Sequence, residues 1–182
     1  MKKFLKIVWQ IIFSLLVLLH VTILFPEDFV LKSKSFENNG KIPSTYTADG
    51  KDISPQLYWT GLPKDTKSLV LIVDDPDAKK VVRRTWIHWI VKDISPYVKE
   101  LPENVIISNI DAKEIKNDFD KTKYCGPYPP KGEHKYVFTL FALDKQADFN
   151  DKITPKAFRK KMGKHILAEA QLFGRYERLN QK

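Results

Sequence analysis

Side chains suited to binding chemistry are concentrated in three short segments, which carry two carboxyl groups, two imidazoles, an indole and a phenol. They are Asp75 and Asp77 in DDPDA, Trp86 and His88 in TWIHW, and His134 and Tyr136 in EHKYVF. Residues two apart in a strand share a face, so Trp86 points the same way as His88, and His134 the same way as Tyr136. If the three segments converge in the fold, these groups line one pocket.

Such a set of groups favours the binding of a small anion. A charged imidazole donates hydrogen bonds from both ring nitrogens, and a nearby carboxylate favours the charged form. We expect Asp75 to orient and charge an imidazole. His88 and His134 would then donate to the anion, and Tyr136 would add a hydroxyl donor. The expected ligand is a small molecule that carries a phosphate or another anionic group.

The loop GPYPPKGEHKY offers a second anion-binding feature. Gly126 allows the backbone to approach a ligand closely, and free amides in such turns point at negative charge. Pro127 and the two prolines that follow stiffen the loop, so less entropy is lost on binding. The same loop can instead be a purely structural turn, and the sequence leaves both interpretations open.

Other chemistries lack their sequence signals. No two histidines form a local metal chelate, the only cysteine is Cys125, and no G-x-S-x-G or Gly-rich phosphate loop occurs. A hydrolase that uses a histidine base is therefore the weakest interpretation, and we expect no enzyme, no metal and no cofactor. The 31 Lys and Arg against 22 Asp and Glu give a net charge of +9, but the positive charges are scattered among acids, so no nucleic-acid partner is expected.

The composition of the amino terminus predicts a membrane segment. MKKFLK is basic, and residues 7–25 form an apolar run without formal charge, roughly the hydrocarbon thickness of a bilayer if helical. We expect residues 1–25 to be an uncleaved single-pass anchor, with residues 26–36 as a tether and the domain on the exported side. The alternative is a cleaved signal that leaves a secreted or periplasmic protein, although an A-x-A cleavage site is missing.

The rest of the sequence predicts a mainly β fold. Residues 68–73, 85–91 and 135–143 are short runs that are apolar on both alternating faces, which is typical of buried strands, and Pro-rich or polar turns separate them. The absence of β-α-β alternation favours a sandwich. The exception is residues 154–174, where Thr154 and Pro155 predict a helix start and apolar residues recur every three or four positions.

Residues 33–178 resemble the phosphatidylethanolamine-binding protein family, in its bacterial Raf-kinase-inhibitor-like branch. The resemblance rests on IPSTYTADGKDISPQLYW, DDPDA, the W-x-H-W strand, GPYPPKGEHKYVFTLFALD and HILAEAQLFGRYER, in this order. It implies a Greek-key β-sandwich with peripheral helices and a small anion-binding pocket at one end. The pocket positions carried over by these motifs are Asp75, Asp77, Trp86, His88, Gly126, Pro127, His134 and Tyr136.

The resemblance also implies partners and local differences. Family members have been tied to lipid head groups, kinase regulation and protease inhibition, so we expect a phospholipid head-group-like ligand or, as the alternative, inhibition of a protease or kinase through surface loops. Lys79 stands where the family usually has proline after DPDA, and Tyr128 stands where the bacterial branch tends to have cysteine. Lys123 and Cys125 occupy glycine-like positions.

Overall fold

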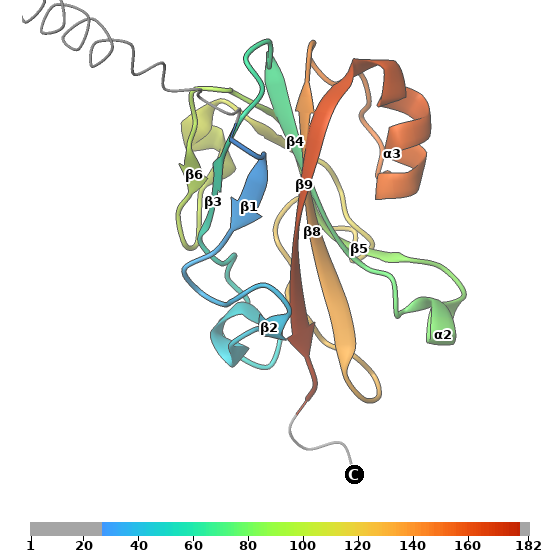
Figure 1. Cartoon of the computed structure of the whole chain (residues 1–182). Helices are drawn as coiled ribbons and strands as arrows, with labels where there is room; N and C mark the ends of the chain where they lie inside the picture. Colours follow the sequence, from blue (N-terminus) through green and yellow to red (C-terminus); the bar gives the residue numbers. More distant parts are fainter. Residues whose placement is uncertain (1–26, 179–182) are drawn as a thin grey trace, which may run out of the picture.

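Two facing β-sheets form the body of the described structure, with short helices at their edges (Figure 1). The computed structural model describes residues 27–178. The smaller sheet has the strand order β1-β3-β6, and the larger has the order β2-β9-β8-β4-β5-β7. The strands are β1 (Val30–Lys32), β2 (Gly40–Lys41), β3 (Leu57–Thr60), β4 (Ser68–Asp75), β5 (Trp86–Ile94), β6 (Glu100–Leu101), β7 (Lys113–Glu114), β8 (His134–Leu143) and β9 (Ile166–Tyr176).

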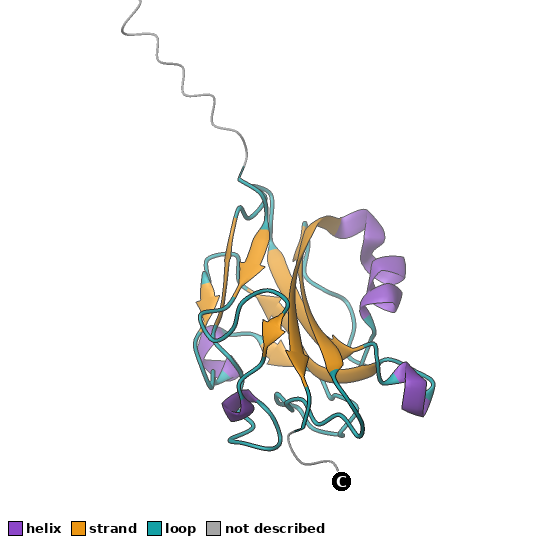
Figure 2. Cartoon of the chain, turned by 60° about the horizontal axis from the view of Figure 1, so that its bottom comes forward, coloured by secondary structure: helices purple, strands orange, loops and turns teal. Residues whose placement is uncertain are grey.

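Within residues 27–178 the helices are few and short, and they lie outside the two sheets (Figure 2). The α-helices of this region are α2 (Lys79–Val82), which lies between β4 and β5 in the chain, and α3 (Pro155–Met162), which lies between β8 and β9. Three single turns of 3-10 helix complete the set: η1 (Ser44–Tyr46), η2 (Ile107–Ile110) and η3 (Gly163–His165). The prediction of a mainly β fold with peripheral helices is therefore confirmed.

The three runs predicted as buried strands form the centre of the larger sheet as β4, β5 and β8. All of β4 is buried, and it pairs antiparallel with both β5 and β8. One face of the sheet packs on the smaller sheet around Trp89 and Phe138, and the other packs on α3 around Phe141 and Phe158. Because both faces are covered, these strands carry apolar residues at successive positions rather than at alternate ones.

The helix predicted over residues 154–174 is wrong beyond its first two turns. Thr154 caps α3 and Pro155 is its first residue, as predicted, but α3 ends at Met162 and η3 follows. Ile166–Tyr176 is a strand, because β8 needs an antiparallel partner along its whole length, and β9 pairs with it from Ile166 to Tyr176. The side chains at positions 170, 172 and 176 are buried with a period of two, which the apolar spacing of three or four had obscured.

The beginning of the described chain also differs from the expectation. Residues 26–36 were expected to tether the domain, but Val30–Lys32 pairs with β3 and Leu31 and Phe36 are buried in the core. Part of the predicted tether therefore belongs to the sandwich. The predicted anchor or signal over residues 1–25 lies outside the described residues.

Within residues 27–178, no helix has both the length and the apolar character needed to cross a membrane.

Phe158 anchors α3 on the outer face of the larger sheet, so its truncation should test this packing. Its ring is fully buried and lies 4.7 Å from that of Phe141 and 5.6 Å from that of Phe149, measured between centroids. We expect Phe158→Ala to lower the free energy of unfolding by about 3–5 kcal/mol, measured by urea denaturation. Lys160→Ala on the exposed face of the same helix is the control and should change it by less than about 0.5 kcal/mol. Equal effects of the two substitutions would contradict this packing.

Candidate functional site

The end of β4 and the starts of β5 and β8 meet at one end of the larger sheet (Figure 1). Antiparallel pairing places Asp75 opposite Trp86, and Asp74 opposite Val137. The segments that carry the predicted carboxylates, indole, imidazoles and phenol therefore lie side by side, although about sixty residues separate the first from the last. This end of the sheet is the candidate functional site.

Asp75 and His134 form a buried hydrogen-bonded pair at this end. His134 Nδ1 lies 2.7 Å from Asp75 Oδ2, and both side chains are almost fully buried. The other carboxylate oxygen of Asp75 accepts a hydrogen bond of 3.0 Å from the backbone amide of Ala78. Both oxygens of Asp75 are thus engaged, and they join β4 to the turn that leads into α2 and to the first residue of β8.

His88 lies at a β-bulge. Ile87 pairs with Asp74 and Trp89 pairs with Val73, so His88 is an extra residue on β5 at this point. A bulge redirects side chains relative to a regular strand. The His88 ring packs edge-on against Tyr136, with centroids 5.2 Å apart, and against Phe119 at 5.3 Å. Its Nδ1 lies 2.6 Å from the carbonyl oxygen of Cys125, so Nδ1 carries the proton and donates it.

The environment of His88 makes it a neutral imidazole around pH 7. Burial lowers its pKa, while the Cys125 carbonyl and the charge of Asp75 act in the opposite direction. The neutral ring with a proton on Nδ1 leaves Nε2 as a hydrogen-bond acceptor. The expectation was a charged imidazole that donates to an anion. His88 must therefore take up a proton, or receive a hydrogen bond from the ligand, when a ligand binds.

A cavity of about 190 Å³ opens beside these groups. Its walls are largely aromatic and aliphatic, with a few convergent polar groups, which is the usual composition of a small-molecule site. The lining residues are Asp75, Ala78, Val81, Val82, Trp86, His88, Phe119, Tyr128, Pro130 and Tyr136.

The hydroxyl group of Tyr136 is the unsatisfied polar group of this cavity. Its oxygen is buried without a hydrogen-bond partner among the described residues, although the Tyr128 backbone lies close enough to lower its pKa slightly. Burial and then the charge of Asp75 raise the Tyr136 pKa overall, so the phenol stays protonated. A buried, unpaired hydroxyl costs free energy unless a ligand or water satisfies it.

The structure brings four of the eight predicted site residues into the cavity wall: Asp75, Trp86, His88 and Tyr136. The other four lie elsewhere. His134 lies outside the wall and holds Asp75. Asp77 forms an ion pair of 2.8 Å with Lys80 and accepts from the backbone amide of Lys135, and these contacts lower its pKa against the effect of burial.

Gly126 and Pro127 contact the segment around η1 and are not among the residues that line the cavity, although the Gly126 backbone lies close enough to the His88 ring to act on its pKa. A Cβ atom on Gly126 would lie 2.3 Å from the carbonyl oxygen of Tyr46, so the glycine permits a close approach between two backbone segments. The Gly126 amide donates to Asp52, and the Pro127 carbonyl accepts from the amide of Ala48. These contacts support the structural interpretation of the turn, which the sequence left open, for Gly126 and Pro127.

Asn117 is a positioning residue that sequence reasoning missed. Its buried side-chain amide donates to the carbonyl oxygens of His88 and Lys123, each at 2.9 Å, and its oxygen accepts from the amides of Phe119 and Lys121. It therefore ties the bulge of β5 to the loop that places Phe119 on the cavity. Asn117 stands in KEIKNDFDKTK, a run of mixed charge, and a lone asparagine in such a run carries no recognisable signal.

The indole of Trp86 is held by a second missed contact. Arg84 stacks on Trp86, with its guanidinium carbon 4.6 Å from the ring centroid, and donates to Asp118 at 2.7 Å. Asp118 also accepts from the Ile87 amide at 2.7 Å. The segment around residues 117–119 thus supports one wall of the cavity from both sides.

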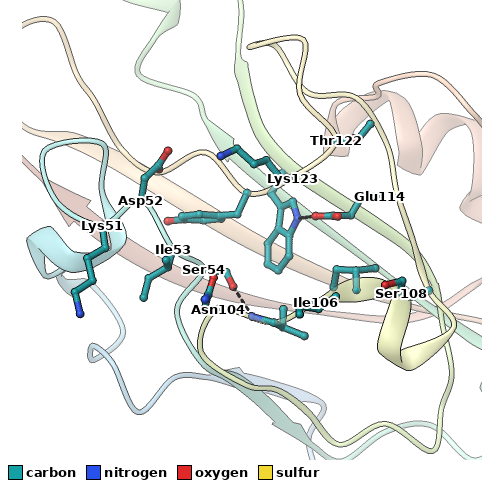
Figure 3. Close-up of a pocket in the computed structure, with 15 residues that line it drawn as sticks. Lys51, Asp52, Ile53, Ser54, Asn104, Ile106, Ser108, Glu114, Thr122 and Lys123 are labelled. Carbon is teal, nitrogen blue, oxygen red and sulfur yellow. Dashed lines mark hydrogen bonds between the residues drawn. The ribbon is translucent and has the colours of Figure 1, made fainter.

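A larger cavity of about 560 Å³ lies farther along the same face of β5, and Figure 3 shows its lining. Lys51, Asp52 and Lys123 give its lining charges of both signs, and the indole of Trp89 donates to Glu114 at 2.6 Å between two of its lining residues. It contains none of the predicted site residues. The smaller cavity is the better candidate because buried His88, Asp75 and Tyr136 converge there, and His88 Nε2 and the Tyr136 hydroxyl have no hydrogen-bond partner among the described residues.

A two-sheet, mostly antiparallel sandwich with a small, partly polar cavity at one end of the larger sheet defines the class of this protein. Residues 32–177 match the model of the family described as phosphatidylethanolamine-binding protein. The chain belongs to the phosphatidylethanolamine-binding protein family, as the resemblance predicted.

Relatives from archaea and bacteria extend this result. The UPF0098 protein of Methanothermobacter thermautotrophicus is 42% identical over 155 residues, which cover 81% of this chain and 98% of that protein. The UPF0098 protein of Archaeoglobus fulgidus is 42% identical over 146 residues, but the matched region spans only 50% of that relative's length. The crystal structure of CT736, a phosphatidylethanolamine-binding protein homolog from Chlamydia trachomatis, is 38% identical, with a TM-score of 0.74 over 82% of this chain and 97% of that one.

The Escherichia coli protein YbcL, described as a member of the mammalian family, has the same fold. It is 26% identical, with a TM-score of 0.73 over 84% of this chain and 99% of that one.

Replacing Asn117 should test its role as the link between β5 and the 117–126 loop. Asn117→Ala leaves four backbone groups without their side-chain partner, so we expect a loss of about 2–4 kcal/mol in the free energy of unfolding, measured by urea denaturation. Asn109→Ala, at an exposed asparagine of η2, is the matched control and should change little. Wild-type stability of Asn117→Ala would refute the positioning role.

Proposed function

We propose that the protein binds a small phosphate-bearing or otherwise anionic molecule, similar to a phospholipid head group, in the 190 Å³ cavity and does not convert it. The observation that carries this proposal is the convergence of His88 and the unpaired Tyr136 hydroxyl on a cavity whose remaining wall is mostly apolar. The Asp75–His134 pair fixes that geometry from the side of β4.

The size of the cavity supports a head-group-sized ligand. Sites for drug-sized molecules are usually about 300–1,000 Å³, so 190 Å³ fits a phosphate with a short substituent rather than a whole lipid. The neighbouring helix α2, which supplies Val81 and Val82 to the wall, is basic: Lys79 and Lys80 lie on it and Arg83 follows directly. Lys80 is paired with Asp77 and Lys79 lines a different cavity, so these charges can favour the approach of an anion without lining the candidate cavity.

Binding without turnover is favoured by the lining groups. Nucleophilic catalysis needs a serine, threonine, cysteine or similar group beside a base, and the described wall of this cavity holds none of these three residue types. Cys125 is buried outside the wall, and burial raises the pKa of its thiol, which disfavours the reactive thiolate.

A second candidate function is inhibition or regulation of a protease or kinase through surface loops. It is favoured by exposed apolar side chains at the cavity mouth, namely Val81, Val82 and Tyr128. A crystal structure of carboxypeptidase Y inhibitor complexed with its cognate proteinase has this fold, at 20% identity and a TM-score of 0.52. That likeness concerns the fold alone, so the protein-partner function depends on the exposed side chains of this chain.

We further propose that residues 7–25 attach the protein to a membrane, with the domain on the exported side. The described chain starts at the end of the sandwich opposite α2 and the candidate cavity (Figures 1 and 2). A membrane anchor before Glu27 would therefore leave the cavity mouth facing away from the bilayer. This arrangement favours a free ligand, or a head group on another surface, over a lipid of the same membrane.

Anion binding should depend on His88 and on pH. We expect phosphoethanolamine, titrated into the full-length protein in mild detergent, to bind more tightly at pH 6 than at pH 8. The reason is that burial lowers the His88 pKa in the empty site, and an anion favours the protonated ring. The gain is at most about tenfold per pH unit beyond the ligand's own titration, measured by calorimetry.

His88→Asn is the decisive variant for this titration. Its amide can keep the bond to the Cys125 carbonyl while removing Nε2, so we expect affinity to fall about 10–100-fold and the excess pH dependence to disappear. His165→Asn, which alters a half-exposed histidine paired with Asp144, is the matched control. Identical heats for wild type and His88→Asn at both pH values would rule out the cavity as the binding site.

Attachment to a membrane can be measured by fractionation of cells that express the full-length chain. We expect the protein in the membrane fraction at its full mass, released by detergent and not by high salt, because residues 7–25 are long enough to span a bilayer. A shorter form in the soluble fraction would establish cleavage instead of anchoring.

A further inference from the structure

A third cavity lies on the opposite face of the larger sheet, between β4, α2 and the start of α3. Its volume is about 490 Å³. Asp74 faces it from β4, while the next residue, Asp75, faces the candidate cavity on the inner side. The two cavities are therefore separate sites that share the end of one strand.

Asp74 is a buried carboxyl group that is not satisfied by the protein. The residue is only 5% exposed, and its Oδ1 has no hydrogen-bond partner within the part of the chain that the structure describes. Such a group is costly unless something outside the chain pairs with it. Asp74 lines this cavity, and a ligand bound there could pair with its carboxyl group after a small rotation that brings Oδ1, which solvent does not reach in the structure, to the cavity surface.

The charges around Asp74 favour an anionic ligand in this cavity. Lys79, Arg84, Lys156 and Arg159 all line the cavity, so four cations surround a single carboxyl group. Arg84 and Arg159 are occupied by Asp118 and Glu169. The ammonium groups of Lys79 and Lys156 form no ion pair with any described residue. A metal cation would be repelled by this wall, and an anion would be attracted.

The start of α3 adds donors on the same side. Thr154 caps the eight-residue helix by accepting from the Ala157 amide, and Lys156 is in the first turn, where no carbonyl of the helix accepts its amide. A helix amino terminus carries partial positive charge. The hydroxyl group of Thr139 lies in the same wall and accepts from Gln171 at 3.2 Å.

We propose that this cavity binds inorganic phosphate in its protonated form, with Asp74 accepting the phosphate hydroxyl and Lys79, Lys156 and the start of α3 facing its charged oxygens. Hydrogen phosphate satisfies both the unpaired carboxylate and the unpaired cations. Sulfate carries no proton at neutral pH and would place an oxygen lone pair against the carboxylate. Ionised Asp74 therefore selects phosphate over sulfate.

The ionisation of Asp74 supplies a test of this geometry. Burial and then the neighbouring charge of Asp75 raise the pKa of Asp74 to about 7, while Arg159 and Lys79 act against them. Each neighbouring element brings a charged group near Asp74. These groups are Asp75 on β4, Lys79 on α2, Arg84 before β5, and Lys156 and Arg159 on α3. Glu169 on β9 acts through its ion pair with Arg159. Below this pKa the carboxyl group donates a hydrogen bond, so sulfate becomes acceptable; above it, only a protonated oxyanion fits.

The experiment is an NMR titration of the full-length protein in mild detergent with phosphate, sulfate or methyl phosphate at pH 6 and pH 8. Amide shifts at Lys156 and Ala157 report this cavity, and the Trp86 indole reports the candidate cavity, so failure of either proposal is seen separately. We expect phosphate to bind here at both pH values. Sulfate should bind at pH 6 and at least tenfold more weakly than phosphate at pH 8. Methyl phosphate, which is a dianion without a proton at pH 8, should behave like sulfate.

Variants complete the test. Asp74→Asn always offers a donor, so sulfate should bind it equally at both pH values and the preference for phosphate should disappear. Lys156→Ala, at an exposed residue, should weaken both anions at least threefold, while Lys160→Ala on the same helix should not. Two results would overturn the proposal: no shift at Lys156 and Ala157 with phosphate, or equal affinities for phosphate and sulfate at pH 8 in the wild type. The wild-type comparison and Lys156→Ala decide the question even if Asp74→Asn fails to fold.

Discussion

The carboxylate of Asp75 is the constraint on which the candidate site depends. Both of its oxygens are used, one by the ring of His134 and the other by the Ala78 amide. These two bonds fix the first residue of β8 and the turn into α2 relative to the end of β4. Because α2 supplies Val81 and Val82 to the cavity and β8 supplies Tyr136, the two bonds of Asp75 reinforce the strand pairing in holding the walls of the cavity together. A buried carboxylate without such partners would be costly, so the same bonds that shape the site also make the burial of Asp75 tolerable.

The opposite wall depends on a deviation from regular strand pairing. An extra residue at His88 places it and Trp89 in the interior between the two sheets, where each contacts a different cavity. Such a bulge leaves backbone groups unpaired. The Asn117 side chain and the Cys125 amide both donate to the His88 carbonyl, so the following loop satisfies this backbone group, and the His88 ring in turn donates to the carbonyl of Cys125. The loop is thus a support for β5 as much as a wall of the cavity.

These features explain which parts of the molecule the sequence predicted. Buried strands such as β4 leave a strong signal, because covering both faces requires a continuous apolar run. The convergence of Asp75, His88 and Tyr136 came from motif order and family resemblance, and spacing alone would not have established it. The bulge, the role of Asn117 and the neighbour of Gly126 depend on contacts between segments far apart in the chain, which no local pattern encodes. The apolar residues within 166–176 fit both the helical spacing of three to four and the strand period of two. The segment is a strand because it pairs with the otherwise open edge of β8.

Adjacent acidic residues on β4 connect the two faces of the sheet electrostatically. The charge of Asp75 favours the protonated form of Asp74 on the outer face and of His88 on the inner face. An anion bound beside His88 would add negative charge near Asp75 and raise the Asp74 pKa further. A larger fraction of Asp74 would then be protonated and able to donate a hydrogen bond. Protonation of His88 would offset part of this charge, so the coupling is strongest for a ligand that binds the neutral imidazole. The charge of Asp75 therefore links the protonation of groups on the two faces of the sheet.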